Sequence, residues 1–344
     1  MNTENEEIRI VSLIPSATEI VVALGYGDRL VGRSHECDYP SFVKSLPICT
    51  EPKFDPVGTS EQIHQRVTEL LSSALSVYRV KTDVLAALAP THIITQAQCE
   101  VCAVSLSDVK KAVADLMSAG EGDAEEGDAE KDSAERDEIE VVSLQPERLE
   151  DVWTDMMAVA AALGQPATAA ERAIAAYKER LPNASSETDL VQNTRPKVAC
   201  IEWTQPLMAA GNWVPELVEL AGGIDCLGTA GAHSAWTSWE ELAIADPDII
   251  IVLPCGYDLA QTQQATDEMA NNRANNSQWH KLKAVKSGQV YLADGNQYFN
   301  RPGPRLVESY EILAEIIQGK AINPQRASAG WQPWQPSSSA EVRE

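Results

Sequence analysis

The sequence predicts an α/β protein with two lobes and a long helical connection between them. In both halves of the chain, short apolar runs alternate with helical patterns. One local pattern, a helix end followed by a proline and an apolar strand, occurs at 85–94 and again at 242–251. Residues 147–181 have a helical pattern with one break, at 164–166. These observations indicate two similar α/β halves on a stiff connector.

In the first half, strands are expected where apolar and β-branched residues cluster, because such runs are typical of buried strands. The first helix is expected to start within residues 15–19, with Ser16 as its N-cap, because a serine hydroxyl suits that position. Ser105 and Asp108 have the spacing of a capping box, which predicts the start of a later helix. The expected strands lie at 8–14, 30–32, 92–95 and 141–144, and further helices at 60–76, 81–89 and 106–118.

The second half repeats this outline, with expected strands at 197–202, 249–251 and 289–293 and expected helices at 214–221 and 304–318. Residues 120–138 are acidic and low in complexity, which predicts a disordered insertion. The expected division of the chain is therefore an N-terminal lobe at 8–145, a connecting helical segment at 146–182, a C-terminal lobe at 183–320 and a loose tail at 321–344.

Composition and charge exclude several classes of protein. The formal net charge is −24, and no concentrated basic face is visible, so nucleic acid is not an expected partner. No apolar run reaches the roughly 18 residues of a membrane span. The N-terminus is acidic, unlike an export signal, and the seven cysteines are an odd number. The sequence predicts a cytoplasmic protein with reduced thiols, or a periplasmic one if a preceding segment has been removed.

Two cysteines, Cys99 and Cys102, follow an expected strand and precede an expected helix. Ligands bind at such strand ends in open α/β sheets. Cys37 follows a neighbouring strand, so the three thiols could meet at one edge and bind a metal ion. His35 and Glu36 could complete a four-ligand set. The alternative is that these cysteines are small packing residues.

Aromatic side chains of the second half fall mainly in expected loops, and the chain has eight tryptophans but only three phenylalanines. This bias suits flat apolar walls around a large planar ligand, although some of these rings would serve the core of the lobe. Arg301 is the better ligand candidate in its loop, and Arg305 suits an ion pair within the lobe. No catalytic signature is recognised, so an enzyme is not expected.

Several of these segments together resemble a known family. The run from Arg9 to Ile20, RIVSLIPSATEI, is followed by Leu24-Gly25, Leu30-Val31-Gly32 and Asp38-Tyr39-Pro40, and a turn rich in proline lies at 301–305. The chain resembles the helical-backbone (class III) periplasmic binding proteins of ABC importers, most nearly their cobalamin-binding branch. The resemblance implies two Rossmann-like lobes joined by a long connecting helix, with the ligand cleft between the lobes.

The resemblance also implies a function and a site. The expected function is binding of a cobalamin-like corrinoid, with an ABC importer membrane component as possible partner and a monomer favoured. The alternatives are a haem or iron-chelate binding protein, and a thiolate metal-site or redox protein that uses Cys37, Cys99 and Cys102. The expected ligand-binding residues are Ser34, His35, Glu36, Tyr39, Gln96, Gln98, Trp203, Asn212, Trp213, Trp236, Tyr257, Tyr298, Phe299 and Arg301.

Overall fold

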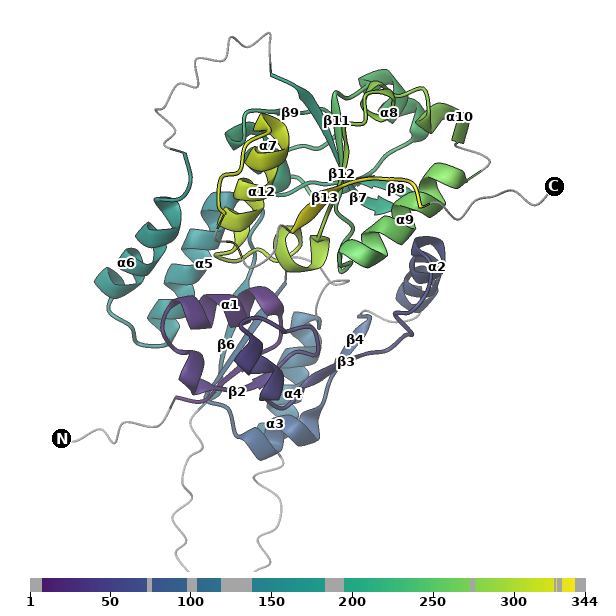
Figure 1. Ribbon diagram of the computed structural model, residues 1–344. Coiled ribbons are helices and arrows are strands. Elements are labelled where there is room, and N and C mark those ends of the chain that lie inside the picture. The colour runs from purple at the N-terminus through teal and green to yellow at the C-terminus, as the bar shows by residue number, and fades with distance from the viewer. Residues whose placement is uncertain are drawn as a thin grey trace, which may run out of the picture. The chain divides into compact units, whose positions relative to one another are not determined.

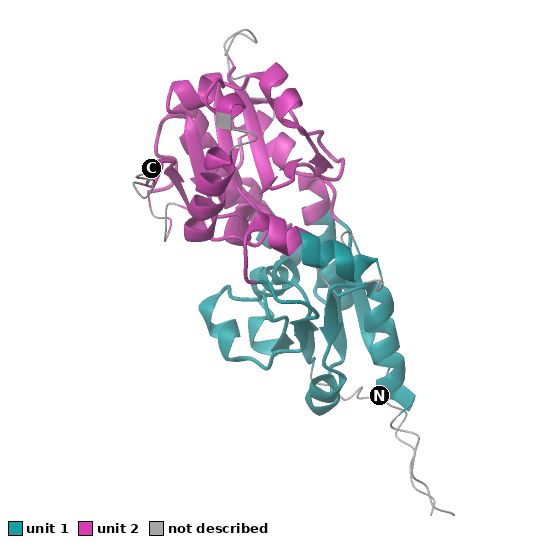
Figure 2. Ribbon diagram, turned by 90° about the vertical axis from the view of Figure 1, so that its right-hand side faces the viewer, with its two compact units in different colours: residues 1–56, 65–145, 153–174 teal, residues 57–64, 146–152, 175–344 magenta. Residues whose placement is uncertain are grey.

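The structure is a computed structural model of the chain and contains two compact units (Figure 1; Figure 2). Unit 1 comprises residues 1–56, 65–145 and 153–174, and unit 2 comprises residues 57–64, 146–152 and 175–344. The structure describes residues 8–72, 76–97, 104–118, 138–182, 195–272, 276–324, 326 and 330–337. The acidic insertion expected at 120–138 lies outside these residues, except for Glu138.

Unit 1 is built on a parallel sheet that, among the described residues, has the strand order β2-β1-β5-β6. A separate antiparallel pair is formed by β3 and β4. The elements assigned wholly to this unit are β1 (Ile10–Ser12), α1 (Pro15–Ala23), η1 (Gly27–Arg29), β2 (Leu30–Arg33), η2 (Ser41–Ser45), β3 (Thr50–Pro52), β4 (Tyr78–Val80), α3 (Thr82–Leu88), β5 (His92–Gln96), α4 (Leu106–Ser118) and β6 (Glu140–Leu144).

The sheet of unit 1 is buried because its central strands are apolar on both faces, as parallel sheets require. Ile10 and Val11 of β1 and Ile93 and Ile94 of β5 have no exposed surface. Pro15 at the first position of α1 fits a helix start, since its missing N–H would have no partner there. The N-cap position is therefore Ile14, and the expected cap at Ser16 is wrong. The α/β class that the sequence predicts is confirmed.

Unit 2 contains a larger mixed sheet in which β7, β11 and β12 are parallel neighbours. The short strands β8 and β10 extend the sheet beside β7, and β13 closes it beside β12. The elements are β7 (Lys197–Thr204), β8 (Leu207–Ala209), α7 (Val214–Leu220), β9 (Ile224–Asp225), β10 (Ala235–Trp236), α8 (Trp239–Ala245), β11 (Ile249–Val252), α9 (Leu259–Asn271), α10 (Asn276–Trp279), α11 (Lys283–Lys286), β12 (Val290–Ala293), η4 (Gly295–Phe299), α12 (Leu306–Gln318) and β13 (Trp331–Pro333).

Successive residues of β7 pack on opposite faces of this sheet, as the alternation of a strand requires. Ala199 and Ile201 belong to a core that also contains Trp279 and Leu282 from the region of α10 and α11. Val198 lies on the other face, close to Gly223 at the end of α7, where side chains of α7 and α12 also approach. Helices therefore cover both faces of the sheet. The loops at the carboxyl ends of the parallel strands are then the part of the sheet where a ligand can bind.

The local pattern that occurs twice in the sequence has the same conformation in both units. The C-cap residues that follow α3 and α8, Ala89 and Asp246, both lie in the left-handed region, with φ of 42° and 39°. A proline follows each of these residues, and the residue before a proline avoids the helical conformation. The following strands, β5 and β11, pair in parallel with β1 and β7. This pattern correctly predicts corresponding strands.

The connecting segment consists of two helices. Helix α5 (Leu149–Ala162) ends before Gly164, whose φ of 68° only glycine adopts easily, and α6 (Ala167–Lys178) begins after Pro166. The side-chain amide of Gln165 donates to the carbonyl of Leu24 at 2.8 Å. The break that the sequence predicts at 164–166 is thus the junction between the two helices. None of the helices described in the structure is long and apolar enough to span a bilayer.

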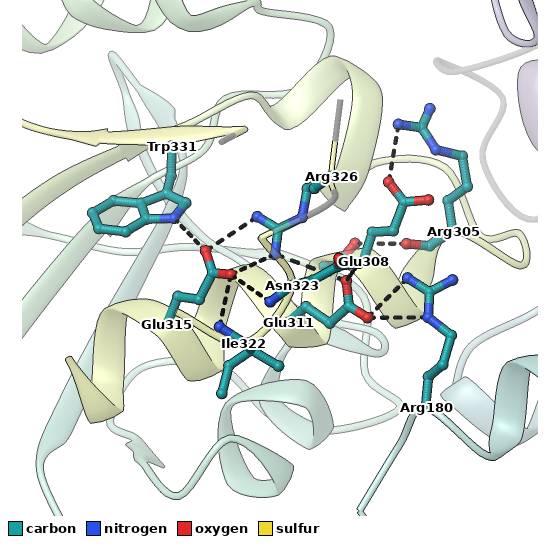
Figure 3. Close-up of polar contacts among 10 residues, drawn as sticks. Arg180, Arg305, Glu308, Glu311, Glu315, Ile322, Asn323, Arg326 and Trp331 are labelled. Atoms are coloured by element: carbon teal, nitrogen blue, oxygen red, sulfur yellow. Dashed lines mark hydrogen bonds and ion pairs between the residues drawn. The ribbon is translucent and has the colours of Figure 1, made fainter. Parts of the chain in front are cut away.

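The C-terminal segment corrects one expectation, because part of the expected loose tail is ordered. Strand β13 pairs with β12, and its Trp331 donates from Nε1 to Glu315 of α12 at 2.9 Å. Arg326 also donates to Glu315, at 2.9 Å (Figure 3). The ring of Trp334 packs edge-on against that of Trp279, with ring centroids 5.6 Å apart. The half-buried rings of Trp331 and Trp334 and the buried ion pair of Arg326 with Glu315 therefore hold a segment whose proline and serine content alone suggests a loop.

Acid is expected to weaken the contacts of this segment. Burial alone would raise the pKa of Glu315, but hydrogen bonds from Trp331, Asn323 and Arg326 bring it below its ordinary value of 4.5. A carboxylate with a lowered pKa in the folded state contributes stability above the unfolded pKa, and this contribution is lost as the pH falls through the folded pKa. We expect Glu315→Gln to lower the free energy of unfolding at neutral pH.

Urea unfolding at a series of pH values measures this difference between the wild type and Glu315→Gln. The difference should narrow as the pH falls below about 4.5. A difference that stays constant as the pH falls well below 4.5 would show that the carboxylate charge does not matter.

Candidate functional site

The loop after β2 in unit 1 is held in one conformation by a buried arginine. The Arg33 guanidinium donates to the carbonyl oxygens of Ser34 at 2.9 Å, Cys37 at 3.0 Å and Lys44 at 3.2 Å. A guanidinium group has five N–H donors in a fixed planar geometry, which suits arginine to this role. The loop lies at the carboxyl end of the parallel sheet, the edge where open α/β sheets bind ligands.

Side chains of this loop form a connected network with the neighbouring strands β3 and β4. Thr50 Oγ1 contacts His35 Nδ1 at 2.8 Å and donates to Ser34 Oγ at 3.2 Å. The Tyr78 hydroxyl donates to Glu36 Oε1 at 3.1 Å, and the rings of Tyr78 and His35 lie 5.1 Å apart. These contacts hold the loop in one conformation, so it is preorganised without a ligand.

His35 is neutral at physiological pH in this setting. Burial of the ring lowers its pKa most, and the positive charges of Lys81 and Arg33 lower it further, against an opposing effect of Glu51. The pKa falls from 6.5 to about 4. Tyr39, which ends the loop, is 43% exposed, whereas Gln96 at the end of β5 is buried.

The structure places only one of the three expected metal-binding thiols. Cys37 is buried, and its sulfur accepts a hydrogen bond from the Thr18 hydroxyl at 3.1 Å. Cys99 and Cys102, together with Gln98, lie outside the described residues. Among the residues that the structure describes, no group of three or more His, Cys, Asp or Glu side chains could hold a metal ion.

In unit 2, strand pairing brings two of the expected tryptophans into one row. Met208 of β8 pairs directly with Trp203 of β7 on one side and with Trp236 of β10 on the other. Directly paired residues in antiparallel strands place their side chains on the same face. We call Trp203, Met208 and Trp236 the tryptophan row; its two outer strands are separated by about 10 Å, twice the spacing between strands.

Two further aromatic residues extend the tryptophan row. Tyr257, in the loop after β11, has its ring 5.3 Å from that of Trp203, and burial raises the pKa of its hydroxyl. His64, in helix α2 (Ser60–Leu71), lies edge-on to Trp236 at 5.2 Å. Trp236 nevertheless remains 58% exposed. The row therefore presents apolar ring surface to solvent at the carboxyl ends of the parallel strands.

Other expected residues of unit 2 lie in its interior. Trp213 is only 5% exposed and donates from Nε1 to the carbonyl of Phe299 at 2.9 Å. Phe299 and Tyr298 are buried, and so is Arg301, which donates to Asn296 Oδ1 at 2.9 Å. These side chains support the loops at the strand ends and have little surface for a ligand. Asn212 is buried as well, with a left-handed φ of 51°.

Sequence reasoning missed the contribution of helix α2 to this surface. Ser60 accepts a hydrogen bond from the Thr204 hydroxyl at 2.8 Å, and its oxygen lies 3.5 Å from the Tyr257 hydroxyl. Residues 57–64 belong to unit 2 although the sequence places them within the first half of the chain. Nothing in the sequence near Ser60 or His64 indicates these contacts. The partners of Ser60, Thr204 and Tyr257, lie 144 and 197 residues away along the chain. Met208 carried no signal either.

Comparisons with known proteins agree with the fold. The model of a family described as "Periplasmic binding protein" matches residues 116–296. The Vitamin B12-binding protein of Vibrio cholerae serotype O1 is 22% identical over 314 residues, which cover 90% of this chain and 89% of that protein. An uncharacterised ABC transporter substrate-binding lipoprotein of Bacillus subtilis, YvrC, is 24% identical over 318 residues, 91% and 81% of the two chains.

A solved structure shows the same likeness in three dimensions. The periplasmic haem-binding protein of Pseudomonas aeruginosa aligns with a TM-score of 0.57 at 20% identity, covering 91% of this chain and 93% of that one. At this identity the likeness shows the fold alone. It confirms the expected two-lobe α/β fold of the family.

The expectation of a cytoplasmic location is wrong. The relatives are periplasmic proteins or, in Bacillus subtilis, a lipoprotein, and both kinds act outside the cytoplasm. The expectation depended on the acidic N-terminus and on the odd number of cysteines. Both are features of composition, and composition is a weak guide to location. The ligand roles of the residues named above, and the expected cleft, stay predictions.

The matched segment of 116–296 covers more than half of the chain, and the resemblance in the first residues of the sequence points in the same direction. The chain belongs to the periplasmic binding protein family.

Proposed function

We propose that this protein captures a cobalamin-like corrinoid outside the cytoplasm and passes it to an ABC importer in the membrane. The observation that supports this most is the tryptophan row, Trp203, Met208 and Trp236, with the exposed indole of Trp236 at its end. Flat indole faces suit the edges and faces of a large ring system. The vitamin B12-binding relative from Vibrio cholerae supports the corrinoid as ligand.

Haem is the second candidate ligand, because the haem-binding protein of Pseudomonas aeruginosa has the same fold. A planar porphyrin would use the same apolar ring surface. Corrinoid and haem are both metal tetrapyrroles, so the two candidates differ in the periphery of the ring and in the metal. Direct titration with each compound distinguishes them.

Truncation of the exposed indole is expected to weaken binding with little effect on folding. Replacing a tryptophan that contributes strongly to a contact surface costs about 2 kcal/mol, or roughly 30-fold in affinity. We therefore expect Trp236→Ala to raise the Kd for the bound tetrapyrrole by this factor. Isothermal titration calorimetry with cyanocobalamin and with haemin measures it.

Ile244→Ala is the matched control, since Ile244 is 76% exposed in the same unit but lies on α8. It should bind like the wild type. If Trp236→Ala binds both compounds as tightly as the wild type, the tryptophan row is not the ligand surface. Wild-type protein that binds neither compound would contradict the proposed function.

A further inference from the structure

The segment between α10 and β12 carries a cluster of lysines on a chain that is otherwise strongly acidic. Lys281, Lys283 and Lys286 lie within six residues that contain no aspartate or glutamate, whereas the formal net charge of the whole chain is −24. Leu282 and Ala284 alternate with the first two lysines and are buried in the core of unit 2. The lysine side chains are exposed and therefore point away from that core.

The three lysines line a cavity of about 320 Å³ together with Asp246 and Ser287. We call this cavity the lysine pocket. Asp246 precedes β11 and the lysines precede β12, so the pocket lies at the amino ends of these two parallel strands. The tryptophan row lies at the carboxyl ends, which form the opposite edge of the sheet. The lysine pocket is therefore distinct from the surface that we propose for the tetrapyrrole.

Hydrogen bonds join the two segments that form the pocket. Asp246 Oδ1 accepts from the backbone N–H of Lys283 at 3.0 Å. The ammonium group of Lys283 forms an ion pair with Asp248, and Asp248 Oδ2 also accepts from the backbone N–H of Lys197 at 2.8 Å. The Ser287 hydroxyl donates to the carbonyl of Lys283 at 2.9 Å. These contacts hold the residues before β11 and before β12 together, so the pocket is formed without a ligand.

Two of the three ammonium groups that line the pocket lack a carboxylate partner. Asp248 neutralises Lys283. Within the part of the chain that the structure describes, the side chains of Lys281 and Lys286 make no ion pair and no hydrogen bond. The lining therefore has an excess of positive charge, even with Asp246 in it. Cations that line one pocket repel each other, and an anion bound between them removes this repulsion.

We propose that the lysine pocket binds a phosphate group. An ammonium group acts as a compact point charge that binds phosphate well, whereas the planar fork of arginine matches carboxylates better. The carboxylate of Asp246 only accepts hydrogen bonds, so it can accept one from the hydroxyl of a free hydrogenphosphate ion. Sulfate carries no hydrogen at neutral pH and would meet only the repulsion of this carboxylate. The lining therefore favours phosphate over sulfate.

Isothermal titration calorimetry with sodium phosphate, in a phosphate-free buffer of low ionic strength, tests this proposal. The double variant Lys281→Ala/Lys286→Ala removes two charge-assisted contacts and should raise the Kd for phosphate by at least about tenfold. Added sodium chloride should weaken binding to the wild type, because salt screens exposed charges. The matched control is Lys110→Ala/Lys111→Ala, which makes the same change in net charge with two exposed lysines of α4 in unit 1. It should bind phosphate like the wild type.

Asp246→Asn tests the preference for phosphate over sulfate. The asparagine oxygen can keep the hydrogen bond from the backbone of Lys283, and asparagine tolerates the left-handed φ of 39° at this position. Loss of the negative charge should raise the affinity for sulfate and reduce the preference. Glycerol 3-phosphate distinguishes the source of the group: binding tighter than that of free phosphate would support the site and assign it to a phosphate ester.

The remaining outcomes separate this site from general attraction to charge. If wild-type protein binds neither phosphate nor glycerol 3-phosphate, the proposal is overturned. Equal affinity of the wild type and Lys281→Ala/Lys286→Ala overturns it as well, and so does an equal loss of affinity in the control with Lys110 and Lys111 replaced. Titration with cyanocobalamin and haemin should give the same Kd for all these variants, so this proposal and the proposed function can fail independently.

Discussion

Replacement of Arg326 by alanine should lower the free energy of unfolding of unit 2 by about 3–5 kcal/mol, the usual cost of breaking a buried ion pair from one side. The Arg326 side chain is 4% exposed and lies 2.9 Å from Glu315 Oε1 and 3.8 Å from Glu311 Oε2. Both carboxylates are buried in α12 (Figure 3). Without the guanidinium, Glu311 would keep its ion pair with Arg180 at 2.8 Å, but the buried carboxylate of Glu315 would lose the cation that lies closest to it.

Urea unfolding followed by tryptophan fluorescence measures this effect, because Trp331 and Trp334 belong to the segment that Arg326 holds. Lys178→Ala is the control: its ion pair with Glu150 is equally short at 2.8 Å, but both side chains are exposed. An exposed pair contributes less than about 1 kcal/mol. If Arg326→Ala and Lys178→Ala lowered the free energy of unfolding by similar amounts, burial of the ion pair would not determine its contribution to stability.

Gly295→Ala is expected to destabilise unit 2 by on the order of 3 kcal/mol and to distort the loops at its strand ends. A Cβ at this position would lie 2.2 Å from the carbonyl oxygen of Pro254 and 2.6 Å from that of Leu253. Both atoms are backbone, so a side-chain rotation cannot relieve the overlap. The loop after β11 carries Tyr257, whose carbonyl accepts from Asn296 N at 3.1 Å, so the displacement should also reach the tryptophan row.

The matched substitution is Gly27→Ala in unit 1. Its Cβ would meet only side-chain atoms, of which the nearest is a ring atom of Phe42 at 3.2 Å, and a half-exposed ring can move by that amount. We expect a change of less than about 0.5 kcal/mol for Gly27→Ala. Thermal unfolding and titration with the tetrapyrrole report stability and binding separately. Normal stability of Gly295→Ala would show that the two loops can separate at low cost.

Local sequence patterns were sufficient for most of the regular elements. Uninterrupted β-branched runs predict strands such as β1 and β11, because only a strand buried on both faces tolerates apolar residues at every position. Proline after a helix predicts the ends of α3 and α8, since it excludes the helical conformation from the residue before it. These signals lie within a few residues of the structure that they determine.

Local sequence patterns did not predict the short strands β8, β10 and β13. Strands β8, β10 and β13 have two or three residues each, too few for an alternation to be recognised. Their existence depends on pairing with β7 and β12, which is a long-range contact. The tryptophan row is a consequence of that pairing, so the sequence could name Trp203 and Trp236 as candidates without showing that they share a face with Met208.

The sequence by itself determined the α/β class, the two similar halves and the helical connection, because each follows from periodicity or from a local motif. The family was indicated by a resemblance to known proteins. Only the tertiary structure decided which candidate side chains are exposed: Trp236 is accessible, while Trp213 and Phe299 are enclosed. It also decided that helix α2 contributes Ser60 to unit 2 and that Thr50 contacts the ring of His35. Burial and hydrogen bonding between distant residues depend on how the elements pack, and a pattern along the chain does not record that packing.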